Sequence, residues 1–564
     1  MPDANESKLN TMKKLLFLLL LGFALQQCAF AKSVEADLLL INGKVFEPER
    51  LSTQSIAIQD GRILAISDAK SIKRYQGKKT KVIDLLGKTV IPGLIDSHIH
   101  AIRAGLYFGS EVDWADAQSI PEAMGRLESK ARTLAPGEWL VVAGGWTDRQ
   151  FIEKRKPSLE EVSKASLGHP FYIQFLYDGF LISPSVIENK TLDIPLELFA
   201  RLKVESVSSS GEDRPTGWFY TDARTVSEIF ELLPKPSFPK QIEGTKSFFS
   251  ELNRNAMTGV LDPGGYNLSS SAYETVRFLN KRKDLTIKLR YFLCSPSRGS
   301  ELADFQSIVA AEKIQQQGEF YRWNGIGENV TWGMYNNENP SKTQQQELED
   351  VLIWANNNSL TVTLHWNNDQ SVHYLLDVIE KVNAAKPIKT LRWSVAHLND
   401  ASEASLSRMH SLGLGWLVQD AFYYQGERFA ERRGANLAEQ VPRIMFAINR
   451  GMTVAMGTDA HRVMTYKPFT ALQWLLTGKT AGGVVLGSVQ ERPSRMQALK
   501  MYSQNSAWFS FEDRERGVIQ VGAKADLAVL NRDYFSVPVD EIHKTRSVLT
   551  IVEGRIVYSD DPTR

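Results

Sequence analysis

The chain has 564 residues, of which 43% are hydrophobic and 23% charged, so it can bury a large core and is expected to hold one large domain and a smaller one. Its formal net charge is +1, and acidic and basic residues are mixed along the chain. This distribution of charge includes neither a basic stripe of the kind that binds nucleic acid nor an acidic tail. We therefore expect a small-molecule partner and no nucleic-acid partner, and the composition leaves a homo-oligomer open.

Residues 1–31 have the pattern of a secretory signal peptide. Lys13 and Lys14 precede an apolar run over 15–25, and Ala29-Phe30-Ala31 follows it. The run is too short for a relaxed bilayer span, and the small residues suit cleavage after Ala31. We expect export to the periplasm and no membrane span in the mature chain.

The two cysteines limit the covalent chemistry of the mature chain. Cys28 follows the apolar run, which keeps lipoprotein anchoring as an alternative, although Gln27 is a poor residue before a lipidated cysteine. Removal of the signal would leave Cys294 alone, so no intramolecular disulfide is expected. The mature chain must then be stabilised by its core, with help from any bound metal.

Short strands with glycine turns are predicted at both ends of the mature chain. They lie at 37–46, 55–66, 81–91, 517–522, 525–530, 548–554 and 555–558. We expect the two ends, 32–90 and 511–564, to form one small β-sandwich together.

Between these ends, apolar strand-like runs alternate with amphipathic helical stretches. The runs are 139–143, 171–175, 259–262, 289–293, 360–364, 391–395 and 453–457. Alternation of this kind predicts an α/β fold with a parallel sheet and helices outside it. The span 91–510 is longer than an ideal eight-fold barrel, which predicts a (β/α)8 TIM-type barrel with long insertions. The Ser- and Pro-rich stretch at about 181–240 is the expected insertion and a candidate lid.

The strongest motif is Ile91-Pro-Gly-Leu-Ile-Asp-Ser-His-Ile-His100, an apolar strand that ends in two histidines. Alternate side chains of a strand share a face, so His98 and His100 can both point into a barrel and bind one cation. The spacing alone is a modest signal, since two surface histidines after a buried strand would give the same pattern.

This motif, together with Asn42-Gly43, Asp60-Gly61-Arg62 and Gly522-Ala-Lys-Ala-Asp-Leu527, resembles the amidohydrolase superfamily. Gly144-Gly145-Trp146 and the long insertion resemble its YtcJ-like branch, amidohydrolase family 3, which includes N-substituted formamide deformylases. The resemblance covers nearly the whole mature chain. It implies a β/α barrel whose strand ends bind one or two divalent metal ions, with zinc expected.

The resemblance also implies where the remaining ligands lie. His365 and His397 each end a strand-like run, where the active-site loops of a barrel begin. Asp459 matches the family aspartate that follows the eighth strand, binds metal and relays protons, although an aspartate there can also cap a helix. Glu328 occupies the position at which relatives often carry a lysine, and it could bridge two cations or simply be a solvated or capping residue.

Two departures from the family pattern bear on the substrate pocket. Relatives usually have a histidine where this chain has Phe180, which puts the familiar substrate range in doubt, and the residues after His365 are bulkier than usual. Trp146, Trp366 and His461 are therefore candidate pocket walls, although buried aromatic residues more often belong to a core.

The expected chemistry is hydrolysis of a non-peptide carbon–nitrogen bond by metal-activated water, with Asp459 as the catalytic acid and base. An esterase or lactonase would use the same metal centre and stays an alternative. So does an inactive periplasmic binding protein on the same fold. A serine hydrolase is disfavoured, because no Gly-x-Ser-x-Gly elbow follows a strand.

Overall fold

The computed structural model describes residues 34–47, 50–209, 212–265, 270–314 and 318–561. The signal peptide predicted over 1–31, and Cys28 within it, lie outside the described residues. Within the part that is described, none of the helices combines the length and the apolar character that crossing a bilayer requires.

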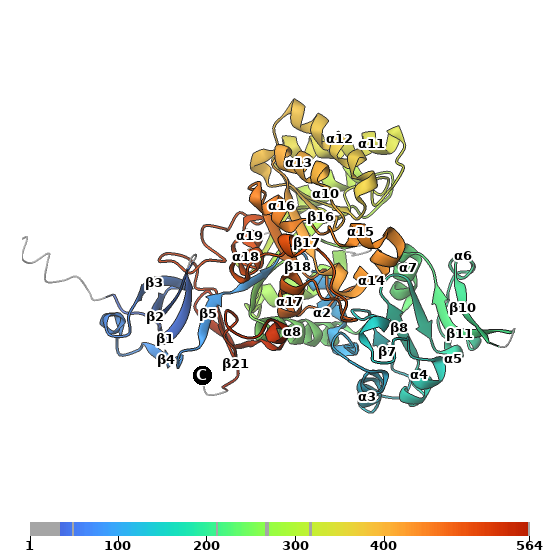
Figure 1. Ribbon diagram of the computed structural model, residues 1–564, viewed down its shortest axis with the longest axis horizontal. Helices are drawn as coiled ribbons and strands as arrows, with labels where there is room; N and C mark the ends of the chain where they lie inside the picture. The colour runs from blue at the N-terminus through green and yellow to red at the C-terminus, as the bar shows by residue number, and fades with distance from the viewer. Residues whose placement is uncertain (1–33, 48–49, 210–211, 266–269, 315–317, 562–564) are drawn as a thin grey trace, which may run out of the picture.

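Eight parallel strands form a barrel at the centre of the molecule (Figure 1). In order around the barrel they are β6 (Leu94–Asp96), β12 (Met257–Asp262), β13 (Lys288–Leu293), β14 (Tyr321–Ile326), β15 (Thr361–Trp366), β16 (Ser394–His397), β17 (Gly415–Gln419) and β18 (Val454–Gly457). Hydrogen bonds from Ser97 N to Met456 O (3.2 Å) and from Asp459 N to His98 O (2.7 Å) join the last strand to the first. The predicted (β/α)8 TIM-type barrel is confirmed.

Helices cover the outside of the barrel. They include α8 (Phe238–Arg254), α9 (Glu274–Lys281), α10 (Glu301–Ile314), α11 (Lys342–Asn357), α12 (Asp369–Ala385), α13 (Glu403–Leu412), α16 (Ile444–Asn449) and α17 (Pro468–Thr477). Sequence signals begin several of them: Ser341 and Gln344 form a reciprocal capping box at α11, and the Ser402 side chain caps α13. The apolar faces of these helices and the outer faces of the strands share the largest core of the protein. That core fixes the strands, and hence the residues at their carboxyl ends.

The two ends of the chain join in one sheet beside the barrel (Figure 1). Its strands are β1 (Leu38–Glu47), β2 (Arg50–Gln59), β3 (Arg62–Ser67), β4 (Lys81–Asp84), β5 (Thr89–Pro92), β19 (Leu527–Leu530), β20 (Ser547–Val552) and β21 (Arg555–Ser559). β19 pairs with β5, and side chains of both halves share one apolar core, which confirms that the ends associate. The strand predicted at 517–522 is absent from the described chain, where the C-terminal strands begin at Leu527.

Two strands predicted for the barrel belong to a different sheet. The runs at 139–143 and 171–175 form β7 (Leu140–Val142) and β8 (Phe171–Phe175), which pair in a five-stranded sheet with β9 (Gly179–Ile182), β11 (Glu212–Tyr220) and β10 (Lys203–Ser209). This sheet lies on the opposite side of the barrel from the terminal sheet (Figure 1). It thus starts earlier in the chain than the insertion predicted at about 181–240. β14, which precedes Glu328, and β17, which the sequence analysis did not identify, complete the barrel instead.

Candidate metal centre

The two histidines of the His-x-His motif follow β6 and face the carboxylate of Asp459. The Nε2 atoms of His98 and His100 lie 3.6 and 3.0 Å from Asp459 Oδ1. His100 donates from Nδ1 to the carbonyl oxygen of Gly264 at 2.7 Å. Because a carbonyl can only accept, this bond fixes the tautomer and leaves the Nε2 lone pair of His100 free for a cation.

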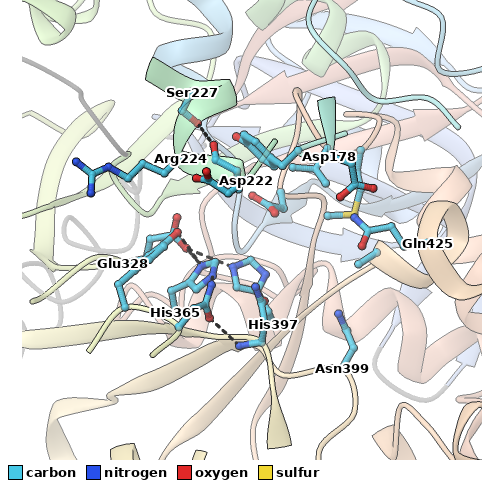
Figure 2. A pocket seen from close by; sticks show the side chains of 18 of the residues that line it. Asp178, Asp222, Arg224, Ser227, Glu328, His365, His397, Asn399 and Gln425 are labelled. Carbon is cyan, nitrogen blue, oxygen red and sulfur yellow. Dashed lines mark hydrogen bonds and ion pairs between the residues drawn. The ribbon is translucent and has the colours of Figure 1, made fainter. Parts of the chain in front are cut away.

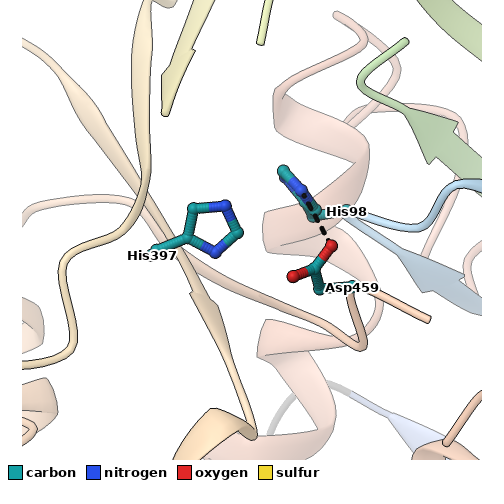
Figure 3. Close-up of side chains that lie close together, drawn as sticks. All are labelled: His98, His397 and Asp459. Atoms are coloured by element: carbon teal, nitrogen blue, oxygen red, sulfur yellow. Dashed lines mark ion pairs between the residues drawn. The ribbon is translucent and has the colours of Figure 1, made fainter. Parts of the chain in front are cut away.

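Glu328 lies at the centre of four imidazoles. Its Oε2 is 3.4 Å from His98 Nε2, 2.9 Å from His365 Nδ1 and 3.3 Å from His397 Nε2, and its Oε1 is 3.6 Å from His100 Nε2. The carboxylate follows β14, whereas the imidazoles come from the ends of β6, β15 and β16. The structure therefore brings all six predicted ligand residues together, and Figure 3 shows three of them, His98, His397 and Asp459.

Both carboxylates and two of the imidazoles of the centre have pKa values shifted toward the forms that bind a cation. Burial would raise the pKa of Glu328, but His365 and His98 hold it well below its usual value, and the histidines do the same for Asp459. Burial lowers the pKa of His98, and burial together with His397 lowers that of His365 to about 4. Burial opposes the charge of His397, but its hydrogen bond to Glu328 and the nearby Asp459 raise its pKa. The anionic carboxylates and the neutral imidazoles of His98 and His365 are in their ligating forms.

The donor set fits a divalent cation. Each of three trios has ligand atoms within 4.8 Å of one another: His98, His397 and Asp459; His98, His100 and Glu328; Glu328, His365 and His397. Among the described residues, neither ring nitrogen of the fully buried His98 has a hydrogen-bond partner, and the nearest carboxylate oxygens are 3.4 and 3.6 Å from Nε2. Buried polar atoms are rarely left unpaired, so His98 is arranged for a ligand other than protein. Four imidazoles and two carboxylates are donors that zinc accepts.

The ligand cluster lies at the floor of a cavity of ≈ 640 Å³. Its walls include the turn between β8 and β9, the start of α7 (Ala223–Leu232) and α14 (Ala421–Arg433). Figure 2 shows Glu328 and His365 facing Asp222 and Arg224 across the cavity. A cavity of this size holds a small molecule and brings it to the cluster.

The three residues predicted as pocket walls lie outside this cavity. Trp146 is fully buried in the core of the inserted region, where its Nε1 donates to Gln174 O at 2.8 Å. Trp366 points into the core between barrel and helices, and its Nε1 donates to Asn368 O. His461 makes a very short contact with Glu111 instead of facing the cavity. Phe180, the departure from the family pattern, is likewise buried in a core, among Tyr172 and Phe219.

Sequence reasoning missed the aspartates that support the ligands. Asp96 accepts hydrogen bonds from His98 N (2.9 Å) and from Thr458 Oγ1 (2.7 Å), so it ties the first strand end to the last. Asp262 accepts from Gly264 N (3.0 Å), and thereby holds the carbonyl that orients His100. Both aspartates end buried barrel strands, and that position was a signal that could have found them.

Tyr335 and Asn336, which hold His365, carried no comparable signal. The ring of Tyr335 stacks on the imidazole with centroids 4.4 Å apart, and Asn336 Nδ2 lies 2.7 Å from His365 Nε2. Both residues lie in the loop between β14 and α11, and no periodic pattern marks such a loop. Tyr335 covers one face of the imidazole and Asn336 contacts its Nε2, so Nδ1 is the ring nitrogen of His365 that contacts Glu328.

Comparisons with known proteins agree with this geometry. A model of the amidohydrolase family matches residues 81–558. An N-substituted formamide deformylase from Arthrobacter pascens is 22% identical over 553 residues, covering 93% of this chain and 98% of that protein. The putative amidohydrolase YtcJ of Bacillus subtilis is 20% identical over 532 residues, covering 90% and 96%. An uncharacterized metal-dependent hydrolase from Pyrococcus horikoshii has a similar fold, with a TM-score of 0.61, 19% identity and coverage of 89% and 99%.

Proposed function

The chain belongs to the amidohydrolase family and is an enzyme that hydrolyses carbon–nitrogen bonds other than peptide bonds, and from this premise we propose that it cleaves an amide-type bond of a small molecule with water. The family predicted from the sequence is thereby confirmed. The observation that carries the proposal is the convergence of four imidazoles and two carboxylates at the floor of one cavity. The deformylase activity named for the Arthrobacter pascens relative makes N-acylated amines the first substrates to test.

His98, His100, Glu328, His365, His397 and Asp459 would hold one or two divalent cations, and we propose zinc. Glu328 is the carboxylate that belongs to two of the three ligand trios, and its two oxygens would suit a bridging role between two cations. When bound, such a cation lowers the pKa of a coordinated water and polarises a carbonyl group.

Asp459 performs the proton transfers in this proposal. Its carboxylate lines the cavity, so it is placed to accept the proton of the attacking water. The same oxygen then gives that proton to the departing nitrogen, because an amine leaves poorly without one. Nε2 of His100 and Nε2 of His98 lie 3.0 and 3.6 Å from Oδ1 of this carboxylate. The products are a carboxylic acid and an amine.

Asp459→Asn tests this role. The amide keeps the shape of the side chain but cannot take a proton, so kcat for hydrolysis of N-formyl and N-acetyl amines should fall by about 10³-fold or more while much of the metal stays bound. Formate or acetate release measures turnover, and elemental analysis measures the amount and identity of the metal in the same preparations. Ester isosteres of the same compounds separate amidase from esterase activity. Near-normal rates in the variant would remove Asp459 from the mechanism, and wild-type protein without stoichiometric metal would remove the metal centre.

We further propose that the mature enzyme is exported. The proposal rests on the lysine pair and apolar run before Ala31. N-terminal sequencing of protein recovered from the periplasm should find Lys32 first. A mature chain that starts at Cys28 would indicate lipoprotein anchoring instead.

A further inference from the structure

Arg103 is a buried arginine at the edge of the ligand cluster. It lies on α2 (Ala101–Tyr107), which begins directly after His100, and only 4% of its surface is exposed. Its side chain lines the same cavity as His100 and Asp459. Arg103 cannot be a ligand of the cation, because its guanidinium is itself positively charged.

The charge of Arg103 is not paired within the described chain. No carboxylate oxygen of the described residues lies within the 4 Å of an ion pair, and Arg103 Nε has no hydrogen-bond partner there. Its hydrogen bond to the Tyr177 hydroxyl, from Nη2, is long at 3.5 Å. Burial opposes the charge, yet neighbouring groups, Tyr177 and Asp459 foremost, keep the pKa of Arg103 above its usual value. The described residues thus stabilise the charge of Arg103 from beyond ion-pair distance, and they leave its buried guanidinium without a close partner for its fork of donors.

Other arginines of the same region differ from Arg103 in this respect. Arg224, which also lines the cavity, is exposed and bonded to Glu228 at 2.7 Å. Arg462 is as buried as Arg103, but it does not line the cavity, and its guanidinium lies 3.6 Å from the centre of the Phe230 ring. Arg103 alone of these three combines burial, a place on the cavity wall and no close carboxylate.

From these observations we propose that Arg103 binds a carboxylate group of the substrate, so that the enzyme acts on amides that are themselves anions. This inference rests on the proposed function. The planar fork of a guanidinium matches a carboxylate with two parallel hydrogen bonds. Tyr177 is placed to donate a further hydrogen bond to the same group.

The test compares N-formylphenylalanine with its neutral carboxamide, N-formylphenylalaninamide, by formate release from the zinc-loaded enzyme. Arg103→Met should lower kcat/KM for the carboxylate at least about 30-fold and change that for the carboxamide less than about 3-fold. Arg103→Lys keeps the charge but loses the fork, so its value should lie between wild type and Arg103→Met. Arg462→Met is the matched control, since it removes an equally buried guanidinium and should leave the preference for the carboxylate unchanged. An equal loss on both compounds would overturn the proposal and place Arg103 at the scissile carbonyl.

A binding measurement separates this inference from the proposed function. Calorimetric titration of the zinc-loaded protein with 3-phenylpropanoate should show binding that weakens at least about 30-fold in Arg103→Met, while 3-phenylpropanamide binds both proteins alike. If wild type hydrolyses neither formyl compound but this loss of binding is seen, the carboxylate site stands and amide hydrolysis fails. If Arg103→Met binds 3-phenylpropanoate as tightly as wild type, the carboxylate site is refuted whatever the turnover. Zinc content and melting temperature of each variant show that it is folded.

Discussion

Glu328 contacts imidazoles from all three strand ends. Its two oxygens lie between 2.9 and 3.6 Å from His98, His100, His365 and His397. Replacing Glu328 by glutamine keeps the shape but removes the negative charge that a dication needs from its ligands. We expect Glu328→Gln to weaken zinc binding by at least about 100-fold, as measured by competition with a chelator.

Glu301→Gln is the control for this change. Glu301 is also a buried carboxylate, but it accepts hydrogen bonds from Gly299 N (2.8 Å) and Trp332 N (3.1 Å), and no contact with the cluster imidazoles is found among the described residues. Its variant should retain zinc. Glu328→Gln protein that still holds stoichiometric zinc against the chelator would contradict the central role of this carboxylate.

The ligand residues were predictable because each one follows a strand-like run, and the carboxyl ends of parallel strands meet at one face of a barrel. The pocket walls were not predictable in this way. Trp146 and Trp366 stand next to the right motifs, but a tryptophan beside a strand end can turn either into the cavity or into a core, and both turn into cores. Arg103 was not predicted, because nothing in its sequence neighbourhood distinguishes an arginine that lines a cavity from an arginine on the surface.

At the scale of the elements, the Gly144-Gly145-Trp146 motif joins the inserted sheet to the loop that carries Asp459. Gly145 N donates to Arg462 O at 3.0 Å, three residues after Asp459. A Cβ on Gly144 would lie 1.7 Å from the same carbonyl oxygen, and its φ of +114° is one that side chains rarely adopt. Only glycine therefore allows this approach of the two backbones.

Gly144→Ala should accordingly destabilise the protein by about 3 kcal/mol, because backbone strain and overpacking act together. Gly137→Ala is its control: that glycine has a φ of +82° but open space around it, so only the backbone cost of about 1 kcal/mol applies. Urea unfolding of both variants measures the difference. Equal costs at the two positions would show that the contact with Arg462 O does not matter.

The assignment of strands to sheets was the part of the fold that the sequence did not settle. β7 and β8 are fully buried apolar runs like those of the barrel, so hydrophobic pattern alone cannot say which sheet takes them. β17 spans five residues, a length at which a buried strand and a buried helix segment look alike. The terminal sheet was clearer, since glycine turns separate its strands.

At the scale of the whole molecule, a charge network fastens the amino-terminal face of the barrel to the C-terminal segment. Glu512 is 12% exposed and is bound by Arg290 of β13 at 2.7 Å and by Arg516 at 3.0 Å. Arg322 of β14 approaches the same carboxylate at 3.5 Å. Arg516 also pairs with Asp526 at 2.8 Å, and Arg322 is 39% exposed. Loss of Glu512 therefore leaves the buried guanidinium of Arg290 without a carboxylate partner among the described residues.

The pKa of Glu512 gives this network a defined pH dependence. Burial would raise it, but Arg516 and Arg290 hold it well below its usual value in the folded protein. A carboxyl with a depressed folded pKa contributes stability that is fully present above its unfolded pKa of about 4.5 and is lost as pH falls through the folded value. Glutamine at this position removes the contribution at every pH.

We therefore expect Glu512→Gln to lower the free energy of unfolding by about 3 kcal/mol at pH 7. The difference from wild type should stay constant down to about pH 4.5 and shrink below it. Glu515→Gln is the matched control, since Glu515 pairs with Arg62 at 3.1 Å with both side chains exposed, and it should cost less than about 0.5 kcal/mol. Urea unfolding of the three proteins from pH 7 to pH 3.5 measures these differences. A Glu512→Gln cost that is small, or that grows on acidification, would mean that the arginines are neutralised by other groups and that the network does not join barrel and terminal segment.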